Sequence, residues 1–166
     1  MEYSAGILTL SDKGSKGERE DESARVIENK LKELELNIPL KEYKILPDDE
    51  DKIIKEMCRM ADELNIDLLI TTGGTGLSSR DFTPEATKKI IHREVPGIAE
   101  AIRQESIKKT PHGMLSRGVA GIRKNTLIIN LPGSPKAVSE CMDVIKPALP
   151  HALEILKGEA SECARQ

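Results

Sequence analysis

The stretch Asp67-Leu-Leu-Ile-Thr-Thr-Gly-Gly-Thr-Gly76 passes from a short apolar segment straight into a loop that contains three glycines. An apolar run that ends at a glycine cluster is typical of a buried strand, so we predict a strand over 67–71. The glycines let backbone N–H groups approach an anion, and the threonines add hydroxyl donors. A tight turn without a ligand is the alternative, but three hydroxyls beside three glycines favour an anion site.

Two common phosphate loops do not fit these residues. No Gly-Lys-Ser/Thr follows at Walker A spacing, and Ser79 occupies the position of the third glycine in Gly-x-Gly-x-x-Gly. The next residues contain Pro84, which suits the first turn of a helix, and Thr83, which we predict to be the N-cap of that helix. Asp81 is not needed for such a helix start and lies beside the glycine loop.

Apolar runs and helical periodicities alternate along the rest of the chain. Further strands are predicted at 5–10, 38–46, 118–122 and 126–131. Helices are predicted at 18–36, 50–64, 84–93, 96–108 and 136–157. Pro147 and Pro150 are expected to kink or split the last helix. The alternation predicts an α/β fold with a mostly parallel sheet that is covered by helices on both faces.

The length of 166 residues suits one domain, which we place at 1–157, followed by a polar tail at 158–166. Aromatic residues make up only 2% of the chain and the net charge is −3, which argues against a nucleic-acid partner. The three cysteines form no Cys-x-x-Cys pair, so a reduced, cytoplasmic protein is expected. No apolar stretch approaches the ~20 residues of a membrane span, and no membrane partner is expected.

Four loops rich in polar residues and glycine each follow a predicted strand. They are Ser11-Asp-Lys-Gly14, Pro47-Asp-Asp49, Gly73-Gly-Thr-Gly76 and Pro132-Gly-Ser-Pro135. The carboxyl ends of parallel strands meet at one edge of a sheet, and ligands of such sheets bind beyond that edge. The sequence therefore predicts that these loops form one binding site.

Two carboxylates in these regions are candidate metal ligands. Asp48 follows the strand at 38–46, and Asp81 adjoins the glycine loop. If the strands at 38–46 and 67–71 both flank the first strand, the two side chains reach the same crevice. Together they could hold a Mg²⁺ ion that bridges phosphate oxygens. Helix capping is the alternative for this acidic run, and the sequence does not decide between the two for Asp48.

Cationic and hydroxyl side chains near the same edge are candidates for phosphate contacts. Arg117 could clamp a phosphate through two N–H groups, with Ser116 as a further donor, although an ordinary surface turn explains the pair equally well. Lys136 lies in the first turn of the predicted helix that Ser134 caps, where a cation opposes the helix dipole. An anionic ligand would remove that conflict, which favours a binding role for Lys136.

Four motifs occur in order at the spacing of one known family. They are Thr71-Thr-Gly-Gly-Thr-Gly76, Arg80-Asp-Phe-Thr-Pro-Glu-Ala86, Met114-Leu-Ser-Arg117 and Leu131-Pro-Gly-Ser-Pro135. Over nearly its whole length the chain resembles the MogA/MoaB family of molybdopterin adenylyltransferases, and Gln104-Glu-Ser106 makes it more similar to the MogA type. The glycine motif is shared with molybdenum insertase domains and with the amino-terminal domain of CinA-like proteins.

The resemblance implies the molybdenum cofactor biosynthesis protein fold, a three-layer α/β/α sandwich, in a homotrimer or alternatively a hexamer. It implies that the terminal phosphate of molybdopterin attacks the α-phosphorus of MgATP and that pyrophosphate leaves, with the product passed to a downstream molybdenum insertase. Asp48 and Asp81 would be the essential catalytic and metal-binding carboxylates, and Ser116 would contact the pterin substrate. The full candidate set for substrate and nucleotide binding is Ser11, Asp12, Thr71, Gly73, Gly74, Thr75, Gly76, Ser106, Ser116, Arg117, Gly133, Ser134 and Lys136.

Two other functions remain open on the residues alone. One is a non-catalytic molybdopterin-binding or carrier protein, which would tolerate Asn at positions 48 and 81. The other is a CinA-like nucleotide hydrolase domain. With so few aromatic rings in the chain, adenine and pterin cannot both be stacked between aromatic faces. We therefore expect recognition through glycine-rich backbone, hydroxyls and charges, with aliphatic contacts to the rings.

Overall fold

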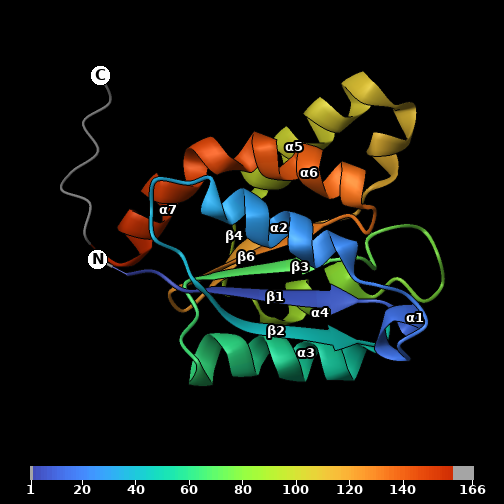
Figure 1. The fold of residues 1–166 in the computed structure, drawn as a ribbon, viewed down its shortest axis with the longest axis horizontal. Helices are drawn as coiled ribbons and strands as arrows, with labels where there is room; N and C mark the ends of the chain where they lie inside the picture. The colour runs from blue at the N-terminus through green and yellow to red at the C-terminus, as the bar shows by residue number, and fades with distance from the viewer. Residues whose placement is uncertain (1, 159–166) are drawn as a thin grey trace.

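The structure, a computed structural model, describes residues 2–158 of the chain (Figure 1). The predicted polar tail therefore falls, from residue 159 onward, outside the described residues. None of the helices in the part that is described is long and apolar enough to cross a membrane.

A six-stranded sheet forms the centre of the fold, in the order β2-β1-β3-β6-β5-β4. The strands are β1 (Ala5–Leu10), β2 (Leu40–Leu46), β3 (Leu68–Thr72), β4 (Arg93–Glu94), β5 (Ala120–Arg123) and β6 (Thr126–Leu131). The first four in spatial order run parallel, whereas β5 is antiparallel to both of its neighbours. The sheet is thus mostly parallel, as predicted.

Helices cover both faces of this sheet and complete the predicted three-layer α/β/α sandwich (Figure 1). One face carries α2 (Glu22–Lys32), α5 (Pro96–Lys109), α6 (Pro135–Ile145) and α7 (Leu149–Leu156). The other face carries α3 (Glu50–Cys58), its π-helical continuation η1 (Arg59–Glu63) and α4 (Thr83–Ile90). Short elements connect them: α1 (Asp12–Ser15), η2 (Pro111–Leu115) and η3 (Lys146–Ala148).

Alternate residues of each central strand enter two separate aliphatic cores. Ile7 and Ile70 belong to the core under α2 and α6, whereas Leu8 and Leu69 belong to the core under α3 and α4. Successive side chains of a strand point to opposite faces, so a strand that is covered on both sides must be apolar throughout. This explains why continuous apolar runs in the sequence identified the central strands.

Several predicted helix boundaries are wrong, and capping explains two of them. The helix predicted over 18–36 begins at Glu22, because the Asp21 side chain accepts a hydrogen bond from the Ala24 N–H and caps it there. Thr83 is not an N-cap, since α4 begins with Thr83 itself and its hydroxyl donates to the Gly73 carbonyl instead. The helix that follows ends at Ile90 rather than 93. The two-residue strand β4 and the short helix α1 were not predicted.

The prolines near the carboxyl terminus act as expected. The predicted helix over 136–157 is divided into α6 and α7 by the 3₁₀ turn at Lys146–Ala148, which contains Pro147.

At the sheet's centre, β2 and β3 both flank β1, which was the condition for bringing the predicted carboxylates together. The chain reverses its direction of travel across the sheet between β1 and β3. Crevices at such reversals are where open α/β sheets bind ligands.

Candidate active site at the carboxyl ends of the parallel strands

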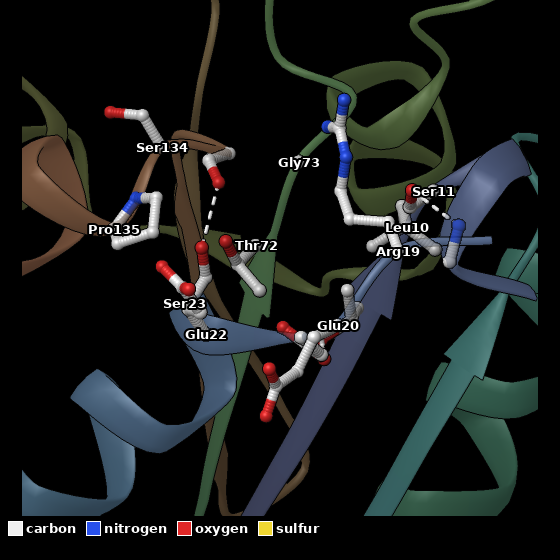
Figure 2. Close-up of a pocket in the computed structure, with 14 residues that line it drawn as sticks. Leu10, Ser11, Arg19, Glu20, Glu22, Ser23, Thr72, Gly73, Ser134 and Pro135 are labelled. Atoms are coloured by element: carbon white, nitrogen blue, oxygen red, sulfur yellow. Dashed lines mark hydrogen bonds between the residues drawn. The ribbon is translucent and has the colours of Figure 1, made fainter. Parts of the chain in front are cut away.

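A cavity of about 550 Å³ opens at the carboxyl ends of β1 and β3 (Figure 2). Its floor contains Leu10 and Thr72, and its rim contains Ser11, Gly73 and Ser134. The segment that leads into α2 closes one side with Arg19, Glu20, Asp21, Glu22 and Ser23. Of the predicted binding residues, the cavity therefore brings together Ser11, Gly73, Gly133 and Ser134.

The glycine loop beside this cavity is held in a left-handed backbone conformation. Gly73 has φ +96° and Gly74 has φ +68°, angles that residues with a Cβ rarely adopt. A Cβ on Gly73 would also overlap the carbonyl oxygen of Leu10. The Thr83 Oγ1 donates to the Gly73 carbonyl at 2.9 Å, and the Thr83 N–H donates to the Gly74 carbonyl at 3.2 Å. The start of α4 thus fixes the loop against the end of β1.

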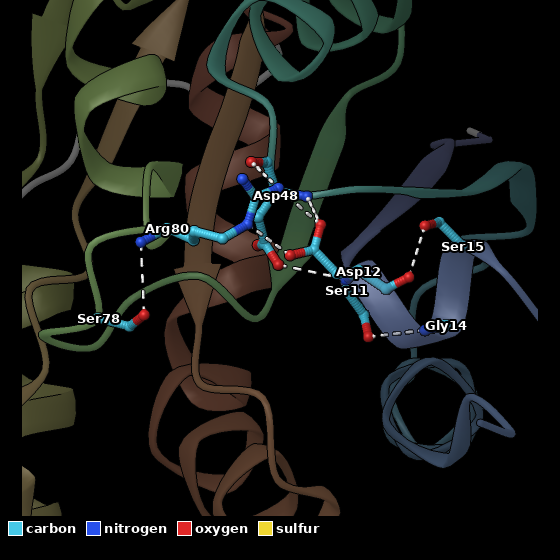
Figure 3. A network of polar contacts seen from close by, with 7 residues as sticks. All are labelled: Ser11, Asp12, Gly14, Ser15, Asp48, Ser78 and Arg80. Carbon is cyan, nitrogen blue, oxygen red and sulfur yellow. Dashed lines mark hydrogen bonds and ion pairs between the residues drawn. The ribbon is translucent and has the colours of Figure 1, made fainter. Parts of the chain in front are cut away.

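Asp12 and Asp48 connect the loops that follow β1 and β2 (Figure 3). The Asp48 N–H donates to Asp12 Oδ1 at 3.0 Å, and the Asp12 N–H donates to Asp48 Oδ2 at 3.3 Å. Arg80 binds the same pair, because its Nε donates to Asp12 Oδ2 at 2.6 Å and its Nη2 to the Asp48 carbonyl at 3.1 Å. The hydrogen bond from Arg80 lowers the pKa of Asp12 to about 2.

The second oxygen of Asp48 is different. Among the described residues, Asp48 Oδ1 is the buried side-chain oxygen without a hydrogen-bond partner. Burial, followed by the negative charge of Asp12, raises the pKa of Asp48, and the charge of Asp81 acts in the same direction. Asp81 Oδ2 accepts from the Ser78 N–H at 3.1 Å and lies close to Gly76. Two carboxylates thus lie beside the glycine loop, that of Asp48 next to Gly74 and that of Asp81 next to Gly76.

These residues fit a divalent cation that is shared with a phosphate. No group of three or more His, Cys, Asp and Glu side chains in the described chain could hold a metal ion by itself. Mg²⁺ usually takes one or two carboxylates and completes its coordination with substrate phosphates and water. The unpartnered Asp48 Oδ1, with the negative charge of Asp81 close enough to act on it, provides that donor set.

Arg117 lies next to the loop, but its guanidinium is already bound to protein oxygens. Its Nε donates to the Gly76 carbonyl and its Nη2 to the Asp81 carbonyl, both at 2.8 Å, and Nη1 pairs with the Glu85 carboxylate. The guanidinium therefore already has protein partners at all three nitrogens, and the two-pronged phosphate clamp stays a prediction. Ser116 is half-buried, and its Oγ accepts from the Gly118 N–H at 3.4 Å.

Other predicted ligands lie within the packing. Thr71 is fully buried and its hydroxyl accepts from Asn130 Nδ2 at 3.0 Å, so it is behind the loop and not at its surface. Thr75 is also buried, and Ser106 packs under Gly113 of η2. Thr71 therefore does not line the cavity, because its hydroxyl points into the layer beneath α4, where Asn130 Nδ2 also donates to Thr87 Oγ1.

Ser134 and Lys136 lie at the predicted positions, the N-cap and the first turn of the helix that follows β6. Ser134 caps α6 by accepting from the Ala137 N–H at 3.2 Å, and Lys136 is exposed in the first turn of that helix. Gly133 is fixed by a hydrogen bond from Ser23 Oγ to its carbonyl at 2.7 Å. This last contact joins α2 to the loop after β6 across 110 positions of sequence, and no local signal predicts it.

The sequence reasoning also missed Arg80 and Asp21. Asp21 Oδ2 accepts from Thr9 Oγ1 at 2.6 Å and from the Tyr43 hydroxyl, while its other oxygen caps α2. Burial, followed by the hydrogen bond to Asp21 and the Asp21 charge, raises the pKa of Tyr43. An Asp directly before a helical periodicity is an N-cap signal that could have located Asp21.

Comparison with known proteins extends over this whole arrangement. Residues 6–151 match the family described as "Probable molybdopterin binding domain". A molybdopterin adenylyltransferase of Helicobacter pylori (strain J99) is 47% identical over 154 residues, 92% of this chain and 87% of that protein. One from Escherichia coli (strain K12) is 36% identical over 172 residues, 96% of this chain and 88% of that protein.

Solved structures agree with the sequence comparison. The molybdopterin biosynthesis enzyme MoaB from Thermus thermophilus has a TM-score of 0.89 at 46% identity, over 96% of this chain and 99% of that chain. The molybdopterin biosynthesis Mog protein from Mycobacterium ulcerans has a TM-score of 0.85 at 38% identity, over 93% of this chain and 99% of that chain.

Proposed function

The chain belongs to the molybdopterin-binding family of molybdenum cofactor biosynthesis proteins, and on that premise we propose that it is a molybdopterin adenylyltransferase. It transfers AMP from ATP to the terminal phosphate of molybdopterin. An oxygen of that phosphate forms a bond to the α-phosphorus of ATP, the bond between the α- and β-phosphates breaks, and pyrophosphate leaves. No side-chain nucleophile takes part.

One observation carries the proposal more than any other. A buried carboxylate oxygen of Asp48 without a partner lies beside Gly74 of the glycine loop, and the Asp81 carboxylate lies beside Gly76 of the same loop. A protein that only had to bind an organic ring would gain nothing from leaving this oxygen unpaired, because such an atom costs stability. A cation shared with the substrate phosphates would give this oxygen a partner.

The chain's own residues then position the two substrates. Backbone N–H groups of the loop from Gly74 to Gly76, with the amino-terminal turn of α6, can orient the phosphates of the two substrates. Ser11 and Ser134 add hydroxyl groups at the rim of the cavity. Phosphoryl transfer depends mainly on such positioning and on charge neutralisation. Mg²⁺ bound by Asp48 and Asp81 would neutralise charge on the phosphates.

The test is incubation of the protein with molybdopterin, ATP and Mg²⁺, followed by detection of adenylylated molybdopterin and pyrophosphate. Asp81→Asn should abolish product formation and leave molybdopterin binding measurable, since the amide is a poor metal ligand. Asp51→Asn is the matched control, because Asp51 is an exposed acidic residue in the first turn of α3. Product at the wild-type rate from Asp81→Asn would refute the metal role.

The same assay separates the two alternatives. Bound molybdopterin without any adenylylated product from the wild-type protein would favour a carrier function. Release of phosphate from a nucleotide without pterin would favour a hydrolase; a CinA protein from Thermoplasma acidophilum shares the fold, with a TM-score of 0.64 at 22% identity. We further propose that the protein acts in the cytoplasm as a homotrimer and passes its product to a molybdenum insertase.

A further inference from the structure

Arg117 joins the two ends of the loop that carries Asp81. The side chain comes from the extended segment between η2 and β5, and its backbone N–H donates to the Thr75 carbonyl at 2.9 Å. From there Nε reaches the carbonyl of Gly76, where the loop begins, and Nη2 reaches the carbonyl of Asp81, where it ends. One guanidinium thus spans the loop at 2.8 Å on each side.

Glu85 sets the orientation of this guanidinium. It lies in the first turn of α4, and its carboxylate accepts from Arg117 Nη1, with Oε2 at 3.0 Å. The Arg117 and Glu85 side chains are 36% and 40% exposed, so solvent screening makes the ion pair itself worth little. The ion pair instead orients Arg117, because it holds the planar guanidinium so that Nε and Nη2 point at the loop.

Few other contacts fix Asp81. Its backbone N–H donates to the Ser78 carbonyl at 3.0 Å, and its Oδ2 accepts from the Ser78 N–H at 3.1 Å. Both partners belong to Ser78 of the exposed loop itself, and the side chain of Arg80 ties that loop to Asp12 and to the Asp48 carbonyl without contacting Asp81. Arg117 is the described side chain that ties the Asp81 backbone to the rest of the fold.

We infer that Arg117 is a positioning residue, which holds Asp81 so that its carboxylate stays beside Gly76 of the glycine loop, and that it does not itself bind substrate phosphate. This inference rests on the proposed function, because the position of the Asp81 carboxylate matters only if it acts on a metal-bound triphosphate. A residue that orients a metal ligand from behind is commonly worth about 10- to 100-fold in metal affinity or activity.

Arg123 provides a matched control. It also donates to one carboxylate, that of Asp62, and to one backbone carbonyl, that of Ile90 at 2.8 Å. It lies at the amino end of β6, and so at the opposite end of that strand from the candidate site, since Arg123 pairs with the first residue of β6. Arg117→Gln and Arg123→Gln therefore remove the same kinds of contact, and only the first lies beside the site.

The experiment measures Mn²⁺ binding in the presence of ATP by electron paramagnetic resonance, with no molybdopterin and hence no turnover. Arg117→Gln should weaken Mn²⁺ binding about 10- to 100-fold, and Arg123→Gln should leave it unchanged. In the adenylylation assay, Arg117→Gln should lower kcat with little change in the KM for molybdopterin. If Arg117→Gln fails to fold by thermal melting, Glu85→Gln is measured instead and should shift both quantities in the same direction.

The opposite pattern of changes in kcat, KM and Mn²⁺ binding would overturn the inference. If Arg117 clamps phosphate, its loss raises the KM for molybdopterin while kcat and Mn²⁺ binding stay at wild-type values. Equal effects of the two arginine substitutions on Mn²⁺ binding would also overturn it. A wild-type protein that binds Mn²⁺ with ATP and forms no product would contradict the proposed function alone. A wild-type protein that binds no Mn²⁺ under these conditions would overturn both proposals.

Discussion

The hydroxyl of Thr83 offers the sharpest test of how the glycine loop is built. Thr83 is fully buried, and its Oγ1 donates at 2.9 Å to the carbonyl of Gly73, a residue with φ +96°. Thr83→Val keeps almost the same shape and removes only this hydroxyl. The substitution therefore leaves a buried carbonyl oxygen without its donor and removes one of the two hydrogen bonds by which Thr83 holds the loop, since the Thr83 N–H still donates to the Gly74 carbonyl.

The expected loss follows from that single contact. An unsatisfied buried acceptor costs about 1–3 kcal/mol, with no large cavity to add to it. For a chain of this length each kcal/mol lowers the melting temperature by about 2–4 °C, so Thr83→Val should melt about 2–12 °C below the wild type. Adenylylation should fall further than stability suggests, by about 100-fold, because a shift of about 1 Å in a positioning group has that effect.

Thr126→Val is the matched control for this prediction. Thr126 is also buried, and its Oγ1 donates to the Ile66 carbonyl at 2.6 Å, but at the amino end of β6 and so at the opposite edge of the sheet. Calorimetry should show similar losses of stability for both variants, while only Thr83→Val loses adenylylation. Full activity in Thr83→Val, or an equal loss of activity in Thr126→Val, would refute the role assigned to this hydroxyl.

Two further predictions concern Asp48 and Asp12, whose loops are joined by hydrogen bonds. Burial and the charge of Asp12 raise the pKa of Asp48, so the ionised form of Asp48 is disfavoured in the folded protein. Asp48→Asn should therefore raise the melting temperature at pH 7 and abolish adenylylation. A melting temperature below that of the wild type would contradict the destabilising effect assigned to the Asp48 charge. Asp12, with its pKa lowered to about 2 beside Arg80, adds stability above its ordinary pKa of 3.8 that is lost as the pH falls toward 2. Arg80→Gln removes that contribution, so its melting temperature should converge with that of the wild type between about pH 5 and pH 2, whereas a constant difference would show that the pair adds nothing.

The architecture was predictable because its signals are local. Each central strand is buried on both faces, as Ile7 and Leu8 show, and so it appears as a continuous apolar run that needs no knowledge of its partners. Glycine and proline clusters then mark where each strand ends. Helix boundaries were less predictable, since the choice between capping and another role for Thr83 depends on a carbonyl ten residues earlier in the chain.

The candidate site was predictable in its position and less so in its contacts. The loops that follow β1, β2, β3 and β6 lie at one end of the parallel strands, and the charge of Asp81 acts on Asp48 because β2 and β3 both flank β1. The sequence gives no means of ranking Arg117 above Arg80, since both are loop arginines beside the glycine motif. Only the folded arrangement shows that Arg117 is bound to Glu85 and two carbonyls, whereas Arg80 joins Asp12 to the loop of Asp48.

The scarcity of aromatic side chains has a structural consequence at the crevice. None of the described residues that line it is aromatic. Tyr3 is buried beneath Lys157, the Tyr43 hydroxyl is bound to Asp21, and Phe82, although part of the site motif, packs against the core under α3 and α4. A purine or a pterin that enters the cavity therefore meets backbone, hydroxyls and the aliphatic surfaces of Leu10 and Pro135. Without stacking faces, the ring edges and the phosphates must carry recognition, and the phosphates contribute through the same loop that Thr83 and Arg117 hold in place.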